Sequence, residues 1–546
     1  MQHNTLIEQL KTNNPALTEL YIGSPWIGRH LRYRRRGNYI RVPDTGWREV
    51  GESIGRSNKL QRLAISEHLT PRQARLFFAG VAKNMSLKSL EVVSSKVSID
   101  HVFTILSQLL AKGVLKELYV ISDCDFWEDG MSFDEIIIPS LPKYSSLTTL
   151  SLRWCRLSDD AVANIIQISR GYPQLESLDF AGNKIQSKGV SKLTSWLKDP
   201  NCRLKSLNLS SNCKVIDYMD TIAEGLKQNC SLEKLVLHCI NVGGRFNASE
   251  LQKLWSAWEN PESRLEDISL SSNGINDDTV IALFNNLVGK RKLKRLMLNL
   301  NTLTMVAWRA LHGYPRHIGY VGTLDPGDYP NRLTAVGWDT ISNHLKSPDC
   351  ILEELYLGTI EDGEADVLKG VVGALAYNKT LKGLYFNSNM DDGHDVTTEV
   401  HHALFNVLCN ASSIMGTYNS NHTLQGMRYG SIQFSRYSDD ITFCLGLNKN
   451  NNRTDAARKK IIKTHFTGDV VVKPFLGMKT EVLPHVLAWM GKGSTNVEED
   501  SENEEFALLY RFVRETPQMF CFVGNSTNAP SYYGSPRKRK ATHLVE

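Results

Sequence analysis

The sequence lacks long apolar runs and carries little net charge for its length. No uninterrupted apolar segment reaches the length of a transmembrane helix, and the opening MQHNTLIEQLKTNN has neither the basic flank nor the apolar core of a signal peptide. The formal net charge is only +5 over 546 residues. These absences argue against a membrane protein and against nucleic-acid binding by the molecule as a whole. We predict a soluble protein in the cytoplasm.

Catalytic signatures are also missing. The segments GMKT at Gly477 and GKGS at Gly491 do not complete the GxxxxGK[ST] phosphate loop. The sequence contains no nucleophile elbow, zinc-binding pair or glycine-rich dinucleotide turn. We therefore predict a protein that is not an enzyme, with no cofactor and no metal site.

A repeated leucine pattern runs through most of the chain. The stretch LESLDFAGNKI, residues 175–185, follows the spacing LxxLxLxxNxL, and related stretches recur at intervals of 28 to 33 residues between Leu115 and Leu293. Thirteen copies are clear, and a decayed fourteenth copy opens at Val321 in the gap between the copies at Leu293 and Leu352. The clear copies open at Leu17, Leu60, Leu87, Leu115, Leu147, Leu175, Leu204, Leu232, Leu265, Leu293, Leu352, Leu381 and Leu424.

Each copy has the pattern of a strand, a turn and a helix. Apolar residues alternate with polar ones at the start of the copy, which indicates a strand with one buried face. The following segment, such as SKGVSKLTSWLKDP, has apolar residues three or four apart, which indicates a helix. One such unit cannot bury its own apolar face, so the copies must stack. We predict an α/β fold, a curved solenoid with parallel strands on the concave face and helices on the convex face.

This pattern resembles the leucine-rich repeat family, and the period with a full helix is similar to its ribonuclease-inhibitor type. The resemblance covers residues 15–430. It implies that the Asn after each strand turns inward and bonds the backbone of the turn, so that these residues are structural and not catalytic. They are Asn183, Asn212, Asn273, Asn301 and Asn389, with Cys155 in the same place in the copy at Leu147.

Beyond the repeats, the pattern changes. We predict a repeat solenoid over residues 1–430, with irregular segments at 24–41 and 316–332, the latter being either a bulged copy or an inserted loop. Residues 440–520 show helical spacing and are interpreted as a cap on the last copy, since an open solenoid end exposes apolar surface. Residues 524–546 have the composition of a disordered basic tail. Their PRKRK, residues 536–540, resembles a nuclear-import signal, so a nuclear location stays open beside the cytoplasmic one.

The concave face is the predicted binding surface for a protein partner. Counting the opening Leu as zero, positions two, four and six point away from the core, and position seven lies at the strand exit. Large or polar anchors at these positions are of the types that dominate protein interfaces. They are Tyr119, Arg153, Trp154, Asp179, His238, Asn299, Tyr356, Tyr385 and Asn387. The alternative is that the aromatic side chains simply fill the narrow concave side or pack on one another as cross-strand pairs.

Two other functions stay open. Ran GTPase-activating proteins use the same type of repeat, but their acidic tail is missing here and none of their residues can be transferred. The insertion IGRHLRYRRRGNYIR combines Arg with Tyr and could contact nucleic acid, or be a solvated loop. Its basic patch is Arg29, Arg32, Arg34, Arg35, Arg36 and Arg41. We favour a monomeric protein-binding scaffold.

Overall fold

The computed structural model describes residues 2–23, 39–43, 45–67, 69–94, 107–122, 134–240, 248–255, 260–271, 273, 275–287, 292–298, 335–360, 365–388, 396–429 and 439–465. The chain divides into two compact units. One contains residues 1–408 and 420–453, and the other contains residues 409–419 and 454–546.

The first unit is built on a single sheet. Its fourteen strands run in the order β14-β13-β12-β11-β10-β9-β8-β7-β6-β5-β4-β3-β1-β2, and every pairing is parallel. The strands are β1 (Glu19–Gly23), β2 (Tyr39–Ile40), β3 (Arg62–Ser66), β4 (Ser89–Ser94), β5 (Glu117–Ser122), β6 (Thr149–Arg153), β7 (Ser177–Asp179), β8 (Ser206–Asn208), β9 (Lys234–Val236), β10 (Asp267–Ser269), β11 (Arg295–Leu298), β12 (Glu354–Ile360), β13 (Gly383–Ser388) and β14 (Gly426–Tyr429).

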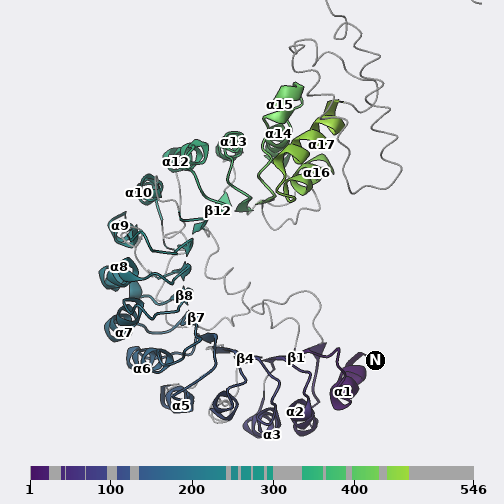
Figure 1. The fold of residues 1–546 in the computed structure, drawn as a ribbon, viewed down its shortest axis with the longest axis vertical. Helices are drawn as coiled ribbons and strands as arrows, with labels where there is room; N and C mark the ends of the chain where they lie inside the picture. Colours follow the sequence, from purple (N-terminus) through teal and green to yellow (C-terminus); the bar gives the residue numbers. More distant parts are fainter. Residues whose placement is uncertain are drawn as a thin grey trace, which may run out of the picture. The chain divides into compact units, whose positions relative to one another are not determined.

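The helices of this unit lie on the outer side of the strands (Figure 1). They are α1 (Gln2–Lys11), α2 (Trp47–Arg56), α3 (Pro71–Val81), α5 (Asp134–Ser140), α6 (Asp159–Ser169), α7 (Ser187–Leu197), the 3₁₀ helix η3 (Val215–Tyr218), α8 (Met219–Gln228), α9 (Ala248–Trp255), α10 (Asp277–Leu287), α12 (Ala335–Lys346), α13 (Ala365–Ala374), α14 (Val396–Leu408) and α16 (Asp439–Asn448). The predicted curved α/β solenoid is confirmed.

Leucines at the centre of each strand form the core. Leu178, Leu207 and Leu235 pair in register across β7, β8 and β9, and each is fully buried. The strand side chains on either side of them face away from the helices. Period-two alternation thus fixes which residues build the core and which line the concave face.

The sheet joins two copies that lie far apart in the sequence. Strand β11 pairs directly with β12, with Arg295 opposite Glu354, and helices α10 and α12 pack side by side. The copy predicted to open at Val321, with the irregular segment 316–332, lies outside the described residues and stays a prediction. One further strand, β2, comes from the segment 24–41; it pairs with β1 at the edge of the sheet and buries Ile40.

Asparagines after the strands form the predicted ladder. The Asn212 side chain donates hydrogen bonds to the carbonyl oxygens of Phe180 (3.0 Å) and Leu209 (2.9 Å), and its Oδ1 accepts one from the Ile185 backbone N–H (3.2 Å). Asn183 and Asn273 make equivalent bonds, and Cys155 takes this place in its copy. Asn301 and Asn389 lie outside the described residues. A buried side-chain amide whose nitrogen donates and whose oxygen accepts hydrogen bonds to the backbone stabilises the turn, and it is not free to take part in catalysis.

A second row of asparagines precedes the strands. Asn84, Asn229, Asn378 and Asn421 are buried, and each donates to carbonyl oxygens near the end of the preceding copy's helix, such as Leu345 O for Asn378 (2.9 Å). In each case Oδ1 also accepts from the backbone N–H of the Leu that opens the strand, three residues on. These amides satisfy carbonyl groups that a helix end leaves without an intrahelical partner.

Helices α2 and α3 approach unusually closely. A Cβ atom added at Gly80 would collide with the backbone of Gly51, and one added at Gly51 would collide with the Phe77 carbonyl. Glycine is needed here because the two backbones touch. Trp47 and Phe77 pack edge to face beside this contact, with ring centroids 5.5 Å apart.

The second unit is described over residues 409–419 and 454–465. Helix α15 (Ile414–Tyr418) lies beside α17 (Arg453–His465), where the Thr417 hydroxyl and His465 Nε2 are 2.8 Å apart. The helix predicted from RTDAARKKIIKTHF is α17. Residues 440–453 of the predicted cap, with most of α16, belong to the first unit. Residues 466–520 and the basic tail lie outside the described residues, and the cap stays a prediction. Within the described part of the chain, no helix has the length and apolar character needed to cross a bilayer.

Candidate functional site

Charged side chains of alternating sign cross four neighbouring strands on the concave face. They occupy position two of their copies and are Lys234, Asp267, Arg295 and Glu354. Lys234 Nζ lies 2.9 Å from Asp267 Oδ2, Arg295 Nη1 lies 3.0 Å from the same oxygen, and Arg295 Nε lies 2.6 Å from Glu354 Oε2. We call these four residues the charge ladder. Each inner member pairs with both neighbours, which restricts its rotamers.

A tyrosine pair continues the ladder. The Tyr356 hydroxyl donates to Glu354 Oε2 at 3.0 Å, and the Tyr356 ring stacks on Tyr385 with centroids 4.2 Å apart and planes 17° apart. Gly383 makes room for this stack, because a Cβ there would lie 2.6 Å from the Tyr385 hydroxyl. Burial raises the pKa of Glu354, but the hydrogen bonds from Arg295 and Tyr356 outweigh burial and leave that pKa below its usual value. Glu354 therefore stays ionised and holds both partners.

Arg153 and Trp154 lie at the end of β6. Arg153 Nε is 3.8 Å from Asp179 Oδ2, a loose ion pair across to β7. Trp154 has a left-handed backbone (φ +59°), and its N–H donates to Ala181 O at 2.8 Å. Its ring covers Gly182, where any Cβ would collide with it, and packs against a buried apolar cluster of Tyr21, Ala64, Val93 and Ile121. The Trp154 ring thus has a packing role.

His238 lies between these two groups. Its Nε2 is hydrogen-bonded to the Ser269 hydroxyl in β10. Burial lowers the pKa of His238 to about 4, with a further contribution from the positive charges of Arg153 and Lys234. The imidazole is therefore neutral at pH 7. We call the concave positions from Arg153 in β6 to Tyr385 in β13, which include His238 and the charge ladder, the concave strip.

The other predicted residues are placed as follows. Tyr119 is half-buried in β5, opposite Ser151 of β6 and Glu91 of β4. Asn387 lies in β13 beyond a register shift and pairs with Thr359, but its side chain is outside the described part. Asn299 and the basic-patch residues Arg29, Arg32, Arg34, Arg35 and Arg36 lie outside the described residues, whereas Arg41 is described and exposed. Their roles in binding stay predictions.

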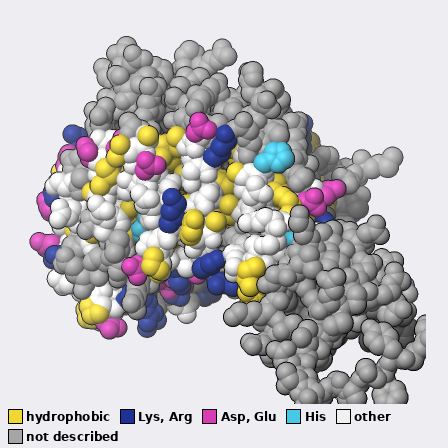
Figure 2. Space-filling model, turned by 90° about the horizontal axis from the view of Figure 1, so that it is seen from above, with side chains coloured by type: hydrophobic (Ala, Val, Ile, Leu, Met, Phe, Trp, Pro, Cys, Tyr) yellow, Lys and Arg dark blue, Asp and Glu magenta, His cyan; other side chains and the backbone are white. Residues whose placement is uncertain are grey.

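The charge ladder is not among the anchors predicted from the sequence, which are mostly aromatic or isolated large side chains. The signal is present at position two, where the copies at Leu232, Leu265, Leu293 and Leu352 carry Lys, Asp, Arg and Glu in succession. When the charge at one position of the repeat alternates in sign from copy to copy, side chains on neighbouring strands are predicted to form ion pairs. One face of the molecule shows charged side chains of both signs interspersed with apolar ones (Figure 2).

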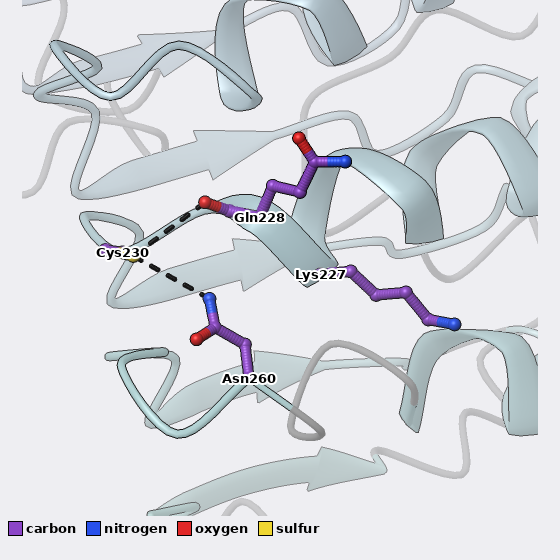
Figure 3. A pocket seen from close by; sticks show the side chains of 4 residues that line it. All are labelled: Lys227, Gln228, Cys230 and Asn260. Atoms are coloured by element: carbon purple, nitrogen blue, oxygen red, sulfur yellow. Dashed lines mark hydrogen bonds between the residues drawn. The ribbon is translucent and has the colours of Figure 1, made fainter.

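A shallow open depression lies where helix α8 ends and the chain leads into strand β9. It is lined by Lys227, Gln228, Cys230 and Asn260, and the Lys227 side chain points away from the other three (Figure 3). The Asn260 amide donates to Cys230 Sγ at 3.7 Å. These groups supply no paired acid and base. Among the described residues, no cluster of His, Cys, Asp or Glu could hold a metal ion.

Comparison with known proteins agrees with the repeat architecture. The family model described as Leucine Rich repeat matches residues 145–165 and 173–193. Mouse ribonuclease inhibitor is 24% identical over 282 residues, covering 46% of this chain and 60% of the inhibitor. Human NACHT, LRR and PYD domains-containing protein 12 is 25% identical over 243 residues, covering 44% of this chain and 20% of that protein.

A solved structure, the leucine-rich repeat-containing protein LegL7 from Legionella pneumophila, has a TM-score of 0.32 at 16% identity and covers 57% of this chain and 95% of LegL7. The chain spans 12% to 60% of the length of three of its curated relatives. The phased leucines, the parallel sheet backed by helices and the asparagine ladder agree with the family match. The chain is a leucine-rich repeat protein of the ribonuclease-inhibitor type.

Proposed function

We propose that this chain is a non-enzymatic scaffold that binds a protein partner on its concave face, along the strip from Arg153 to Tyr385. Proteins with leucine-rich repeats generally mediate protein–protein interaction, which supports this assignment. The observation that carries this proposal is that the side chains of the charge ladder and the tyrosine pair hold one another in place. Side chains already held in one rotamer lose little conformational entropy when a partner binds.

Packing of the aromatics on one another, the alternative role, occurs where Tyr356 stacks on Tyr385. The Trp154 ring packs instead against Gly182. Both tyrosines are nevertheless half-buried, so part of each ring faces outward. They are therefore better candidate anchors than Trp154.

The test compares Tyr385→Ala with Tyr377→Ala in capture of partners from a native cell extract. Tyr377 lies outside the strip and is exposed, so its loss is the matched control. We expect Tyr385→Ala to reduce the captured partner at least tenfold, as expected for an interface hot spot. The melting temperature of both variants must stay within a few degrees of the parent. Undiminished capture by a folded Tyr385→Ala protein would contradict the proposal.

A cytoplasmic location and a monomeric state are part of the same proposal. The GTPase-regulator and nucleic-acid alternatives stay predictions, and of the basic patch behind the second only Arg41 is described. The nuclear-import interpretation of residues 536–540 stays a prediction, because those residues lie outside the described part.

A further inference from the structure

A row of cations lies along the edge of the array where each helix ends and the next strand starts. It belongs to the copies that contribute β3, β4, β5 and β6. We call it the basic edge, and it consists of Arg56, Lys59, Lys83, Lys88, Lys112, Lys116 and Lys143. Six of these side chains are exposed, and Lys116 is half-buried.

Among the residues that the structure describes, acidic side chains leave most of the basic edge without an ion pair. Arg56 makes an ion pair of 3.8 Å with Glu52, but none of the six lysines is in an ion pair with any described residue. The acidic residues of these copies that the structure describes lie elsewhere. Glu67 and Asp134 are at the opposite ends of the strands, and Glu91 and Glu117 occupy concave positions of β4 and β5.

The same edge is neutralised further along the array. Immediately after the opening Leu, lysines of later copies pair with glutamates of the preceding copies. The distances are 2.9 Å for Lys205–Glu176, 2.5 Å for Lys294–Glu266 and 2.8 Å for Lys382–Glu353. Lys88 and Lys116 occupy this position in their copies, but the neighbouring residues there are Gln61 and Thr148. Among the described residues, Lys88 and Lys116 are thus the lysines at this position that face no glutamate.

Helix stabilisation explains only part of the row. A cation in the last turn of a helix favours its negative end, which accounts for Arg56 in α2. Lys83 and Lys143 lie past the last residues of α3 and α5, and Lys112 donates to the Ala82 carbonyl oxygen. The helix ends do not account for Lys88 and Lys116, which stand at the starts of strands. Like charges on neighbouring strands repel each other, so the arrangement is unfavourable until an anion approaches.

Two exposed apolar side chains accompany the basic edge. Met85 is 62% exposed in the loop before β4, and Tyr144 is 72% exposed in the loop before β6. A methionine side chain has no flat face on which a base could stack, but it adapts to apolar groups of a polypeptide. Six of the seven cations are Lys and not Arg, the residue preferred for bidentate binding of phosphate. Both features favour a polypeptide over a nucleic acid.

We propose that the basic edge is a second interaction surface that binds an acidic polypeptide segment with interspersed apolar residues. Carboxylates of the segment lie against the lysines, and its apolar side chains contact Met85 and Tyr144. This surface uses residues separate from the concave strip, so either proposal can fail without the other.

The test uses the full chain and a fluorescent peptide of about 15 residues that alternates Glu with Leu, followed by anisotropy at several salt concentrations. The edge variant is Lys59→Glu, Lys83→Glu and Lys88→Glu combined. The control variant has the same net charge and carries Lys184→Glu, Lys192→Glu and Lys449→Glu, all at exposed positions away from the edge. Circular dichroism melting checks that both variants are folded.

We expect the peptide to bind the parent, with affinity that falls as salt rises. The edge variant should lose at least tenfold in affinity, the control variant less than threefold, and Met85→Ser with Tyr144→Ser should weaken binding without changing its salt dependence. Equal loss in the edge and control variants would overturn the proposal, as would no binding at low salt. Preferential binding of an oligothymidine, lost in the edge variant, would also overturn it and assign the surface to nucleic acid.

Discussion

Removing the side chain of Asn212 should destabilise the repeat array more than its small size suggests. Asn212 is fully buried, with 0% of its surface exposed. In Asn212→Ala, the Ile185 N–H loses its acceptor and the Leu209 carbonyl loses its side-chain donor. The Phe180 carbonyl is less affected, because it keeps a hydrogen bond of 2.9 Å from Asn183.

The magnitude follows from these two lost partners. A buried polar group left without a partner costs about 1–3 kcal/mol, so Asn212→Ala should lower the free energy of unfolding by about 3 kcal/mol. Asn212→Asp keeps the volume but replaces the donor by a carboxylate that faces carbonyl oxygens. Those carbonyl oxygens should raise the pKa of the new carboxyl group in the folded state. The loss of unfolding free energy in Asn212→Asp should then be largest at neutral pH and should shrink as pH falls towards about 4, the pKa of Asp in the unfolded chain.

Denaturant unfolding gives the overall loss, and amide hydrogen exchange locates it. The Ile185 N–H should exchange faster in Asn212→Ala, whereas the amides of the α2–α3 region should keep their parent rates, because repeats contact mainly their neighbours. Asn450→Ala, at an exposed position, is the control and should change stability by less than about 0.5 kcal/mol. A loss below about 1 kcal/mol with unchanged Ile185 exchange would refute the structural role assigned to the ladder.

Three further predictions concern packing and titration. Leu207→Ala, at a fully buried strand centre, should cost about 2–5 kcal/mol in denaturant unfolding; a loss within about 0.5 kcal/mol would contradict the register of β8. Gly80→Ala should lower the melting temperature, because the new methyl collides with the Gly51 backbone; a stable variant would show that α2 and α3 can move apart. The pKa of His238 is about 4 in the folded protein and near 6.5 in the unfolded chain. The neutral imidazole therefore costs the folded state nothing above pH 6.5, and stability is lost as pH falls from 6.5 towards 4. This loss is at most about 3 kcal/mol. The free energy of unfolding of His238→Gln should therefore fall less than that of the parent between pH 6.5 and 4. Identical pH profiles of the two proteins would show that His238 does not cause the loss.

The regular part of the fold could be predicted because each strand is specified locally. The central Leu and its flanking polar residues define the buried face within five residues, and the inward Asn follows at a fixed offset. Those features do not depend on which copy is the neighbour. The opening residues Leu175 and Leu204 therefore identify β7 and β8 without any knowledge of long-range contacts.

The irregular features of the fold depend on contacts that cannot be predicted from the spacing of the repeats. Arg295 pairs with Glu354 across a gap of 59 residues in sequence, where regular spacing suggested another copy in between. Strand β2 pairs at the outer edge of β1 although its two residues lie in an apparently irregular insertion. The flat stack of Tyr385 requires the missing Cβ of Gly383, which is a property of one site and not of the repeat.

The asparagines before the strands have a consequence for covalent modification. Asn84, Asn229, Asn378 and Asn421 each stand two residues before a Ser or Thr and so match the N-x-[ST] acceptor sequence for N-linked glycans. In the folded chain their amide nitrogens are buried and donate to carbonyl oxygens. The hydroxyls of Ser86 and Thr423 also bond backbone carbonyls of the preceding copy. At these four places the acceptor sequence arises from the stacking of the repeats, and a glycan could be attached there only to a chain that had not yet folded.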